Sequence, residues 1–161
     1  RQVKGFGAEV TGVKRDLTLH EYADQLVSLD EVNQHVSLAD VVVLSCPLND
    51  QTSQLVNANF LSRMKPDAVL ANIGRGLLVD EDALVAALDD GKLDYAIMDV
   101  FQKEPLPDDS VFWGHDRVQM TPHSSHRGSR TGELFDALFA HNLSQFLLGK
   151  RVRNLVVPGS F

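Results

Sequence analysis

A histidine, a glutamate and an arginine between residues 75 and 123 could together move a proton to and from a carbonyl group. His123 follows Pro122 and Glu104 precedes Pro105, so the backbone is restricted beside both side chains. A carboxylate next to an imidazole raises the pKa of the ring, and such a ring can protonate a carbonyl oxygen as hydride arrives at the carbon. The planar guanidinium of Arg75 suits a substrate carboxylate. The three side chains therefore indicate the chemistry of 2-oxo acid reduction.

Each of these residues alone has a simpler interpretation. Arg75 lies between two glycines and could be a surface arginine in a tight turn, a lone histidine is more often structural, and Glu104 could be a solvated loop acid. Each one, however, follows an expected strand, over residues 68–73, 95–100 and 117–120. In a parallel sheet the carboxyl ends of the strands meet at one edge, where ligands bind. The coincidence of all three favours an active site over three unrelated residues.

These strands belong to a chain in which strands and helices alternate. The pattern predicts strands over residues 9–13, 25–28, 41–44, 68–73, 95–100 and 117–120, and helical segments over 1–6, 30–35, 57–64, 80–91 and 130–148. Residues 41–44 are continuously apolar, as in a strand that is buried on both faces. Asp80 is the expected N-cap of the fourth helix, and Gly91 its expected end. The alternation predicts a doubly wound, Rossmann-like α/β fold with a parallel sheet.

Composition argues against several classes of protein, namely nucleic-acid-binding, membrane-spanning, disulfide-containing and zinc-binding proteins. The 161 residues include fifteen Lys and Arg against twenty-two Asp and Glu, and the formal net charge of −7 argues against a nucleic-acid partner. The longest apolar stretch, around residues 41–44, is too short to cross a bilayer. The single cysteine, Cys46, excludes an internal disulfide, and the six histidines lack the spacing of a zinc site. We therefore expect a cytoplasmic protein with a small-molecule ligand and no metal.

Four short motifs occur together in one enzyme family. They are Ser45-Cys46-Pro47-Leu48 with Thr52, Asn72-Ile73-Gly74-Arg75-Gly76, Asp99-Val100-Phe101 with Glu104-Pro105, and Thr121-Pro122-His123. Each motif is weak alone, but their order and separations resemble those of the D-isomer-specific 2-hydroxyacid dehydrogenases, which include glyoxylate/hydroxypyruvate reductases and phosphoglycerate dehydrogenases. The resemblance extends over nearly the whole chain, to about residue 158.

The resemblance implies a role for each motif. Arg75 would bind the substrate carboxylate, His123 would act as acid and base, and Glu104 would orient the imidazole and keep it charged. Asp99 would face the nicotinamide end of the cofactor. The residues expected along the cofactor, together with two cations considered below, are Lys14, Arg15, Cys46, Pro47, Thr52, Ile73, Gly74, Arg75, Asp99 and His123.

Cys46 and His126 resemble reactive groups but have other interpretations. Cys46 could be a reactive thiol, whereas a small buried residue at the end of a strand is the more common case. His126 lies close to His123 in the sequence but does not match the motif. We expect His126 to contact the site at most through other residues.

Lys14 and Arg15 bear on the choice of cofactor. They follow the strand expected to end at residue 13, where an acidic residue would bind the 2′-hydroxyl of NAD and cations would accept the 2′-phosphate of NADP. The alternative is that both are exposed loop cations. The sequence favours NADP(H) within the wider expectation of an NAD(P) cofactor.

Two parts of the family pattern are missing from the sequence. The glycine-rich phosphate loop and its preceding strand are expected directly upstream of Arg1, and the substrate domain is also absent. We expect residues 1–150 to form an incomplete dinucleotide-binding domain, with 151–161 leading toward the substrate domain. This chain alone is expected to bind cofactor poorly and to be inactive. The broad apolar stripe over 130–148 predicts that other parts of the protein or a partner subunit cover it, and the family implies a homodimer.

Two other functions share this fold. A dinucleotide-sensing corepressor could retain Arg75, Glu104 and His123 without catalysing a reaction. An enzyme that acts on formate is disfavoured by Glu104, because the formate enzymes of the family have a glutamine at this position. The oxidoreductase acting on 2-oxo or 2-hydroxy acids is the preferred interpretation.

Overall fold

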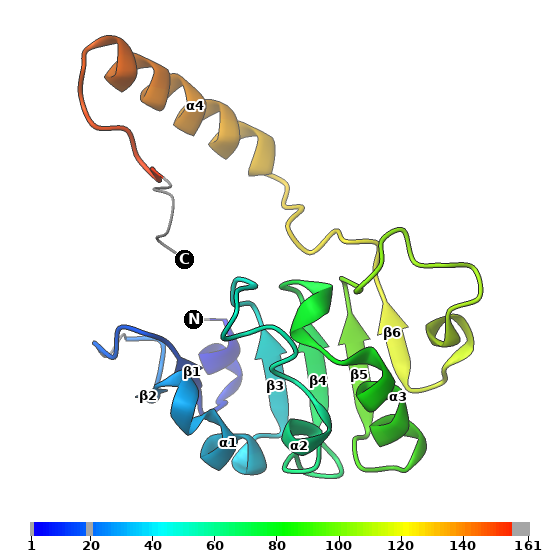
Figure 1. The fold of residues 1–161 in the computed structure, drawn as a ribbon. Coiled ribbons are helices and arrows are strands. Elements are labelled where there is room, and N and C mark those ends of the chain that lie inside the picture. The colour runs from blue at the N-terminus through cyan, green and yellow to red at the C-terminus, as the bar shows by residue number, and fades with distance from the viewer. Residues whose placement is uncertain (1, 19–20, 156–161) are drawn as a thin grey trace.

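The computed structural model describes residues 2–18 and 21–155. Its centre is a parallel sheet in which strands that follow one another along the chain are also neighbours in space (Figure 1). The strands, in spatial order, are β3 (Val41–Leu44), β4 (Val69–Asn72), β5 (Tyr95–Met98) and β6 (Val118–Met120). The predicted parallel α/β fold is thereby confirmed.

The register of this sheet places the last residues of its four strands at one level. Leu44 pairs with Asn72, Asn72 with Met98, and Met98 with Met120. The four loops that follow therefore leave the sheet at the same edge, as the sequence predicted. This level edge carries the candidate site.

A second, two-stranded sheet lies beside the first. It consists of β1 (Thr11–Val13) and β2 (Gln25–Val27), which pair in parallel with each other and not with β3. In the doubly wound order 3-2-1-4-5-6, the first strand occupies the position between the second and the fourth. No strand among residues 2–18 and 21–155 occupies the corresponding position between β1 and β3. The interruption agrees with the expectation that the first strand of the fold lies outside these residues.

Short helices connect the strands. The α-helices are α1 (Val32–His35), α2 (Ala58–Leu61) and α3 (Glu81–Asp89), and the 3-10 helices are η1 (Val3–Phe6), η2 (Leu29–Glu31), η3 (Val36–Leu38), η4 (Gly76–Leu78) and η5 (Val111–Gly114). The first expected helix is thus a 3-10 turn that ends at Gly7 with φ 78°, and Arg1 lies outside the described residues. Asp80 caps α3 by accepting a hydrogen bond from the Ala83 N–H, as predicted.

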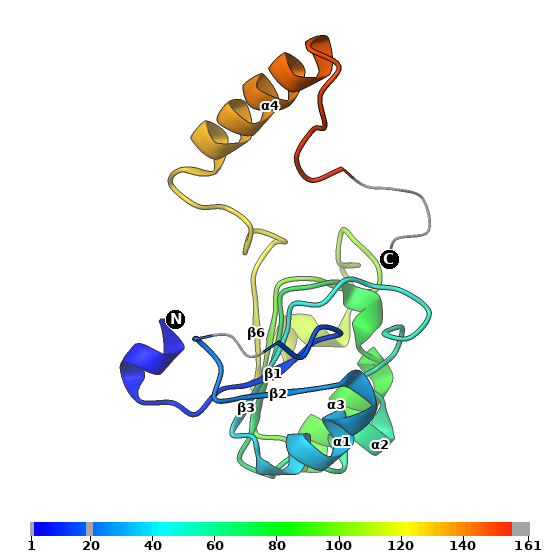
Figure 2. The ribbon, with the colours of Figure 1, turned by 90° about the vertical axis from the view of Figure 1, so that its left-hand side faces the viewer.

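The core lies between the sheet and the helices α1, α2 and α3, which cover one of its faces (Figure 2). Leu70 of β4 and Leu84 and Leu88 of α3 are fully buried there. The prediction that residues 41–44 are buried on both faces is wrong, because Val41 and Val43 are 57% and 54% exposed. Their side chains belong to the opposite face, which no described helix covers at β3.

The last helix, α4 (Thr131–Leu147), extends away from both sheets (Figures 1 and 2). Its apolar stripe is exposed, and Leu134, Phe135 and Phe146 have 62%, 69% and 73% of their surface accessible. The described residues therefore do not provide the cover that the sequence predicted for it. None of the helices described has the length and apolar character needed to cross a membrane.

One close packing contact joins the loop after β4 to the loop after β5. A Cβ atom built on Gly76 would lie 1.9 Å from the backbone carbonyl carbon of Phe101 and 2.4 Å from the backbone nitrogen of Gln102. Both partners are backbone atoms, so no side-chain rotation could relieve the clash. Only glycine fits at this position without moving one of the two loops.

We predict that Gly76→Ala destabilises the protein by about 1–3 kcal/mol, the usual range for overpacking. Urea unfolding followed by the fluorescence of Trp113 would measure the change. Gly132→Ala is the matched control, because a Cβ there meets nothing within 4 Å and Gly132 lies in the exposed helix α4. Equal stability of the two variants would contradict the packing argument.

Candidate active site

The imidazole of His123 is paired with the carboxylate of Glu104. The Nδ1 atom of His123 lies 2.7 Å from Oε2 of Glu104, and both side chains are partly exposed. The second carboxylate oxygen, Oε1, accepts a hydrogen bond of 3.0 Å from the N–H of Phe101. The carboxylate is therefore held from two directions, and the Nε2 atom of the imidazole is left to face another group.

These contacts change the acidity of Glu104. The hydrogen bond with His123 and then the one from the Phe101 N–H hold the pKa of Glu104 below its ordinary value, against an opposing effect of burial. The carboxylate thus remains ionised to lower pH than a free glutamate. An ionised partner is what a proton-carrying imidazole requires.

Asp99 lies at the end of β5 and binds the loop that carries His123. Its Oδ1 atom accepts hydrogen bonds from the Thr121 hydroxyl and from the Ser124 N–H at 2.8 Å, and its Oδ2 accepts one from the Ser125 N–H at 2.9 Å. The residue is only 2% exposed. Burial raises its pKa, but the hydrogen bonds outweigh this effect and hold the pKa well below its usual range.

Arg75 is presented by a turn that Asn72 stabilises. The buried Asn72 side chain donates a hydrogen bond to the Arg75 carbonyl at 2.9 Å and accepts one from the Gly74 N–H at 3.1 Å. The Arg75 side chain is exposed, and its Nη1 donates to the Gly74 carbonyl at 2.7 Å. Because the guanidinium has four further N–H groups, it can still bind a carboxylate.

The loop after β3 contains three residues that the sequence placed along the cofactor. Thr52 is buried, and its hydroxyl donates to the Pro47 carbonyl at 2.8 Å and accepts from the Asn49 N–H at 2.9 Å. Thr52 thus shapes this loop from within. Cys46 is half-buried, and burial raises the pKa of its thiol, which agrees with the structural interpretation rather than with a reactive thiolate.

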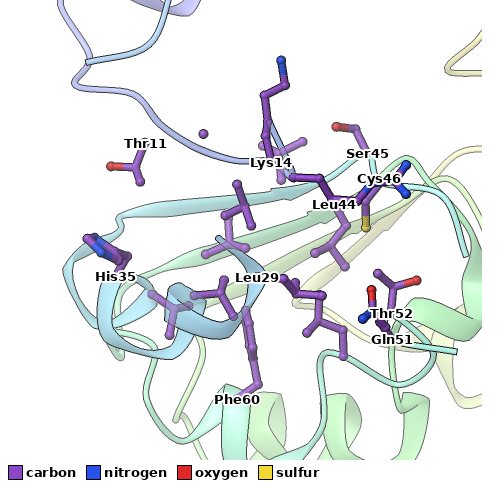
Figure 3. A pocket seen from close by; sticks show the side chains of 18 of the residues that line it. Thr11, Lys14, Leu29, His35, Leu44, Ser45, Cys46, Gln51, Thr52 and Phe60 are labelled. Carbon is purple, nitrogen blue, oxygen red and sulfur yellow. The ribbon is translucent and has the colours of Figure 1, made fainter. Parts of the chain in front are cut away.

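A cavity of about 850 Å³ opens between the two sheets (Figure 3). Its lining includes Cys46, Pro47 and Thr52 of the loop after β3 and the exposed cations Lys14 and Arg15 beyond the end of β1. Apolar side chains also line it, among them Leu29, Val36, Leu44 and Phe60. Figure 3 shows the Lys14 amine directed outward from these apolar walls, as a group that meets a charged ligand would be.

A second cavity, of about 660 Å³, lies at the ends of β3 and β4. Its lining includes Cys46, Pro47, Ile73, Gly74 and Arg75. The two cavities share Cys46 and Pro47 in their linings, so the expected cofactor residues that follow β1, β3 and β4 line two adjacent cavities.

Asp99, Glu104 and His123 line neither of these cavities and stand at the same sheet edge, beyond β5 and β6. The His126 ring meets the His123 ring edge-on, with 6.1 Å between the centroids, so His126 packs beside the imidazole of His123. Within the described part of the chain no group of His, Cys, Asp or Glu side chains could hold a metal ion. This edge of the sheet thus brings together an imidazole paired with a carboxylate, an exposed guanidinium and two neighbouring cavities.

Some residues that hold the site together were not identified from the sequence. Asn72 and Thr121 belong to two of the four motifs, but the sequence predicted no role for either of them, or for Ser124 and Ser125. An asparagine at the end of an apolar strand was the available signal for the first, since a buried amide must find hydrogen-bond partners. The three donors to Asp99 carried no such signal, because serine and threonine are common in loops.

The sequence was compared with known proteins and families. Residues 1–125 match the profile of the NAD binding domain of the D-isomer specific 2-hydroxyacid dehydrogenases. A protein of Erwinia tasmaniensis named glyoxylate/hydroxypyruvate reductase B is 40% identical over 143 residues, which are 86% of this chain and 44% of that protein. The chain spans about half the length of the curated relatives it matches.

Solved structures of this family are also similar. A D-isomer specific 2-hydroxyacid dehydrogenase family protein of Aeromonas salmonicida superimposes with a TM-score of 0.90 at 35% identity, over 97% of this chain and 50% of that chain. A second such dehydrogenase, from Xanthobacter autotrophicus in complex with NADPH and MES, gives a TM-score of 0.86 at 32% identity, over 94% of this chain and 62% of that one.

The pairing of Glu104 and His123 leads to a prediction for acidity. We predict that His123→Ala raises the pKa of Glu104, because the variant removes the hydrogen bond that lowers it most. A carboxyl-carbon NMR titration would measure it. The pKa of Asp24, which Lys4 and the Val10 N–H lower, serves as the control and is expected not to change.

The same contact implies a direction for stability. A carboxyl group whose pKa is lowered in the folded state stabilises the fold above its unfolded pKa, and this contribution is lost as the pH falls through the folded value. Wild type should therefore lose more stability on acidification than His123→Ala. An unchanged Glu104 pKa in the variant would contradict the pairing.

Proposed function

The chain belongs to the D-isomer specific 2-hydroxyacid dehydrogenase family, in its NAD binding domain, and on this premise we propose that the full-length protein containing it transfers hydride between NAD(P)H and a 2-oxo acid. The observation that carries the proposal is the 2.7 Å contact between His123 and Glu104 at the sheet edge where Arg75 also emerges. The product of reduction is a D-2-hydroxy acid.

In this proposal the three side chains have separate tasks. The cofactor supplies the hydride. His123 carries the proton at Nε2 and gives it to the carbonyl oxygen of the substrate, then accepts it back in the reverse direction. Glu104 holds Nδ1 and so fixes the orientation of the ring. Arg75 binds the substrate carboxylate and so orients the carbonyl toward His123.

The residues present fit an NAD(P) cofactor. The cavity of about 850 Å³ is large enough for part of a dinucleotide and passes from Lys14 and Arg15 to Cys46 and Pro47. In this arrangement Lys14 and Arg15 hold the 2′-phosphate of NADP, and Cys46, Pro47, Ile73 and Gly74 lie along the nicotinamide half. The Xanthobacter relative in complex with NADPH supports the preference for NADP(H).

Further features of the whole protein are part of the same proposal. Residues 1–150 form the greater part of the dinucleotide-binding domain and 151–161 lead toward the substrate domain, so this chain alone binds cofactor poorly and is inactive. The protein acts in the cytoplasm as a homodimer. The exposed apolar stripe of α4 supports this, because so many exposed apolar side chains indicate that another surface covers the helix.

We predict that the full-length protein oxidises NADPH with glyoxylate, hydroxypyruvate or pyruvate, and that His123→Ala lowers kcat at least about a hundredfold, the usual range for losing a general acid. Absorbance at the nicotinamide band would measure turnover. His141→Ala is the control, since His141 lies in α4 away from the site. Cofactor binding without turnover of these or other 2-oxo acids would contradict the proposal and favour the dinucleotide-sensing alternative.

We also predict that replacing Lys14 and Arg15 together by alanine raises KM for NADPH about tenfold or more, as expected for losing charge-assisted contacts to a phosphate. KM for NADH should change by less than about twofold, because NADH has no 2′-phosphate to bind. The double alanine variant at Arg63 and Lys92, two exposed cations elsewhere, makes the same change in net charge and controls for it. Equal losses for both cofactors would count against the assigned phosphate site.

A further inference from the structure

The backbone of His123 has a conformation that something must hold in place. Its φ of 49° lies in the left-handed region, which is uncommon for a residue with a side chain. The His123 N–H donates to the carbonyl of Asp99 at 2.9 Å and to that of Thr121 at 3.0 Å. Glu104 contacts only the ring of His123, so it orients the imidazole without fixing the backbone beneath it.

The side chain of Asp99 binds this loop on both sides of His123. The Thr121 hydroxyl comes from before the histidine, and the N–H groups of Ser124 and Ser125 come from after it. Together with the bond from the His123 N–H to the Asp99 carbonyl, one residue at the end of β5 holds four donors of a single loop. The position of the imidazole therefore depends on Asp99.

The same contacts leave Asp99 little capacity for another partner. Its two oxygens already accept from three donors, and the residue is 2% exposed. The carboxylate remains ionised because hydrogen bonds hold its pKa well below the usual range. A charged acceptor forms stronger bonds than a neutral one, so the loop is held more firmly than uncharged side chains would hold it.

We infer that Asp99 is a positioning residue, whose carboxylate fixes the loop of residues 121–125 and thereby places His123 over the reacting carbonyl. This inference rests on the proposed function in so far as His123 is the acid and base. It differs from the role implied by the family resemblance, in which Asp99 faces the nicotinamide. Asp99 and Glu104 thus have different roles: Asp99 holds the backbone of the loop that carries His123, and Glu104 holds its ring.

Three variants of the full-length protein separate the two roles of Asp99. Asp99→Asn changes the acceptor, Thr121→Val removes one donor of the loop, and Thr121→Ser restores that donor. If Asp99 acts through the loop, Asp99→Asn and Thr121→Val each lower kcat about tenfold or more, because small displacements of a catalytic group are costly. Thr121→Ser should recover most of the activity. The Kd for NADPH, measured by fluorescence titration, should change less than about twofold in all three.

A second readout does not depend on turnover. Hydrogen exchange at the Ser124 and Ser125 amides should be faster in Asp99→Asn, because these N–H groups lose their charged acceptor. It should also be faster in Thr121→Val, because the loop loses the hydrogen bond from the Thr121 hydroxyl to Asp99. Thr18→Val is the control, because Thr18 lies in the loop after β1 and has no contact with Asp99. If Asp99→Asn fails to fold by circular dichroism, the Thr121 pair still decides the question.

Two results would overturn the inference. One is a weaker Kd for NADPH in Asp99→Asn with unchanged kcat, and with Thr121→Val equal to wild type, which would place Asp99 at the cofactor. The other is unchanged exchange at Ser124 and Ser125 in both variants. If wild type has no turnover on any 2-oxo acid, the proposed function fails while the exchange measurement still tests whether Asp99 holds the loop.

Discussion

Parallel pairing in register is the constraint on which the candidate site depends. Arg75, Asp99 and His123 are far apart in the sequence, and each follows a different strand. The pairing of Asn72 with Met98 and of Met98 with Met120 brings these three strand ends to one level. A shift by one residue between β5 and β6 would reverse the faces of β6 and move the loop of His123 away from Glu104. The chemistry therefore rests on backbone hydrogen bonds within the sheet.

At this edge the buried polar residues organise the backbone, while the exposed ones are free to react. Asn72 and Asp99 are almost completely buried and direct their side chains to backbone groups of the loops that carry Arg75 and His123. Arg75 is exposed and His123 is partly so. The division has a physical reason, because a buried polar group must be fully hydrogen-bonded, whereas a reacting group needs an open side.

The sequence predicted most of the fold for reasons that the structure makes clear. Strand and helix positions followed from the alternation of apolar and capping residues, and the strands observed are subsets of those expected. The exposure of Val41 and Val43 was missed because an apolar run does not say which neighbouring element covers it. The contacts of the two carboxylates, Glu104 and Asp99, also differ in how far the sequence could predict them. Glu104 and His123 could be paired by motif, but the donors to Asp99 are backbone N–H groups and a hydroxyl that leave no pattern in the sequence.

The two ends of the cofactor region are connected by apolar packing. Lys14 and Arg15 follow β1, whereas Cys46 and Pro47 follow β3, and these two strands do not pair in the part of the chain described here. The chain from β2 to β3 passes through α1 and η3, and Val36 of η3 is buried in the core beneath β3. Among the described residues, the packing of this segment is what joins Lys14 and Arg15 to Cys46 and Pro47. In the doubly wound order a further strand lies between β1 and β3, so backbone hydrogen bonds to that strand, and not apolar packing alone, would set the spacing of these residues in a complete domain.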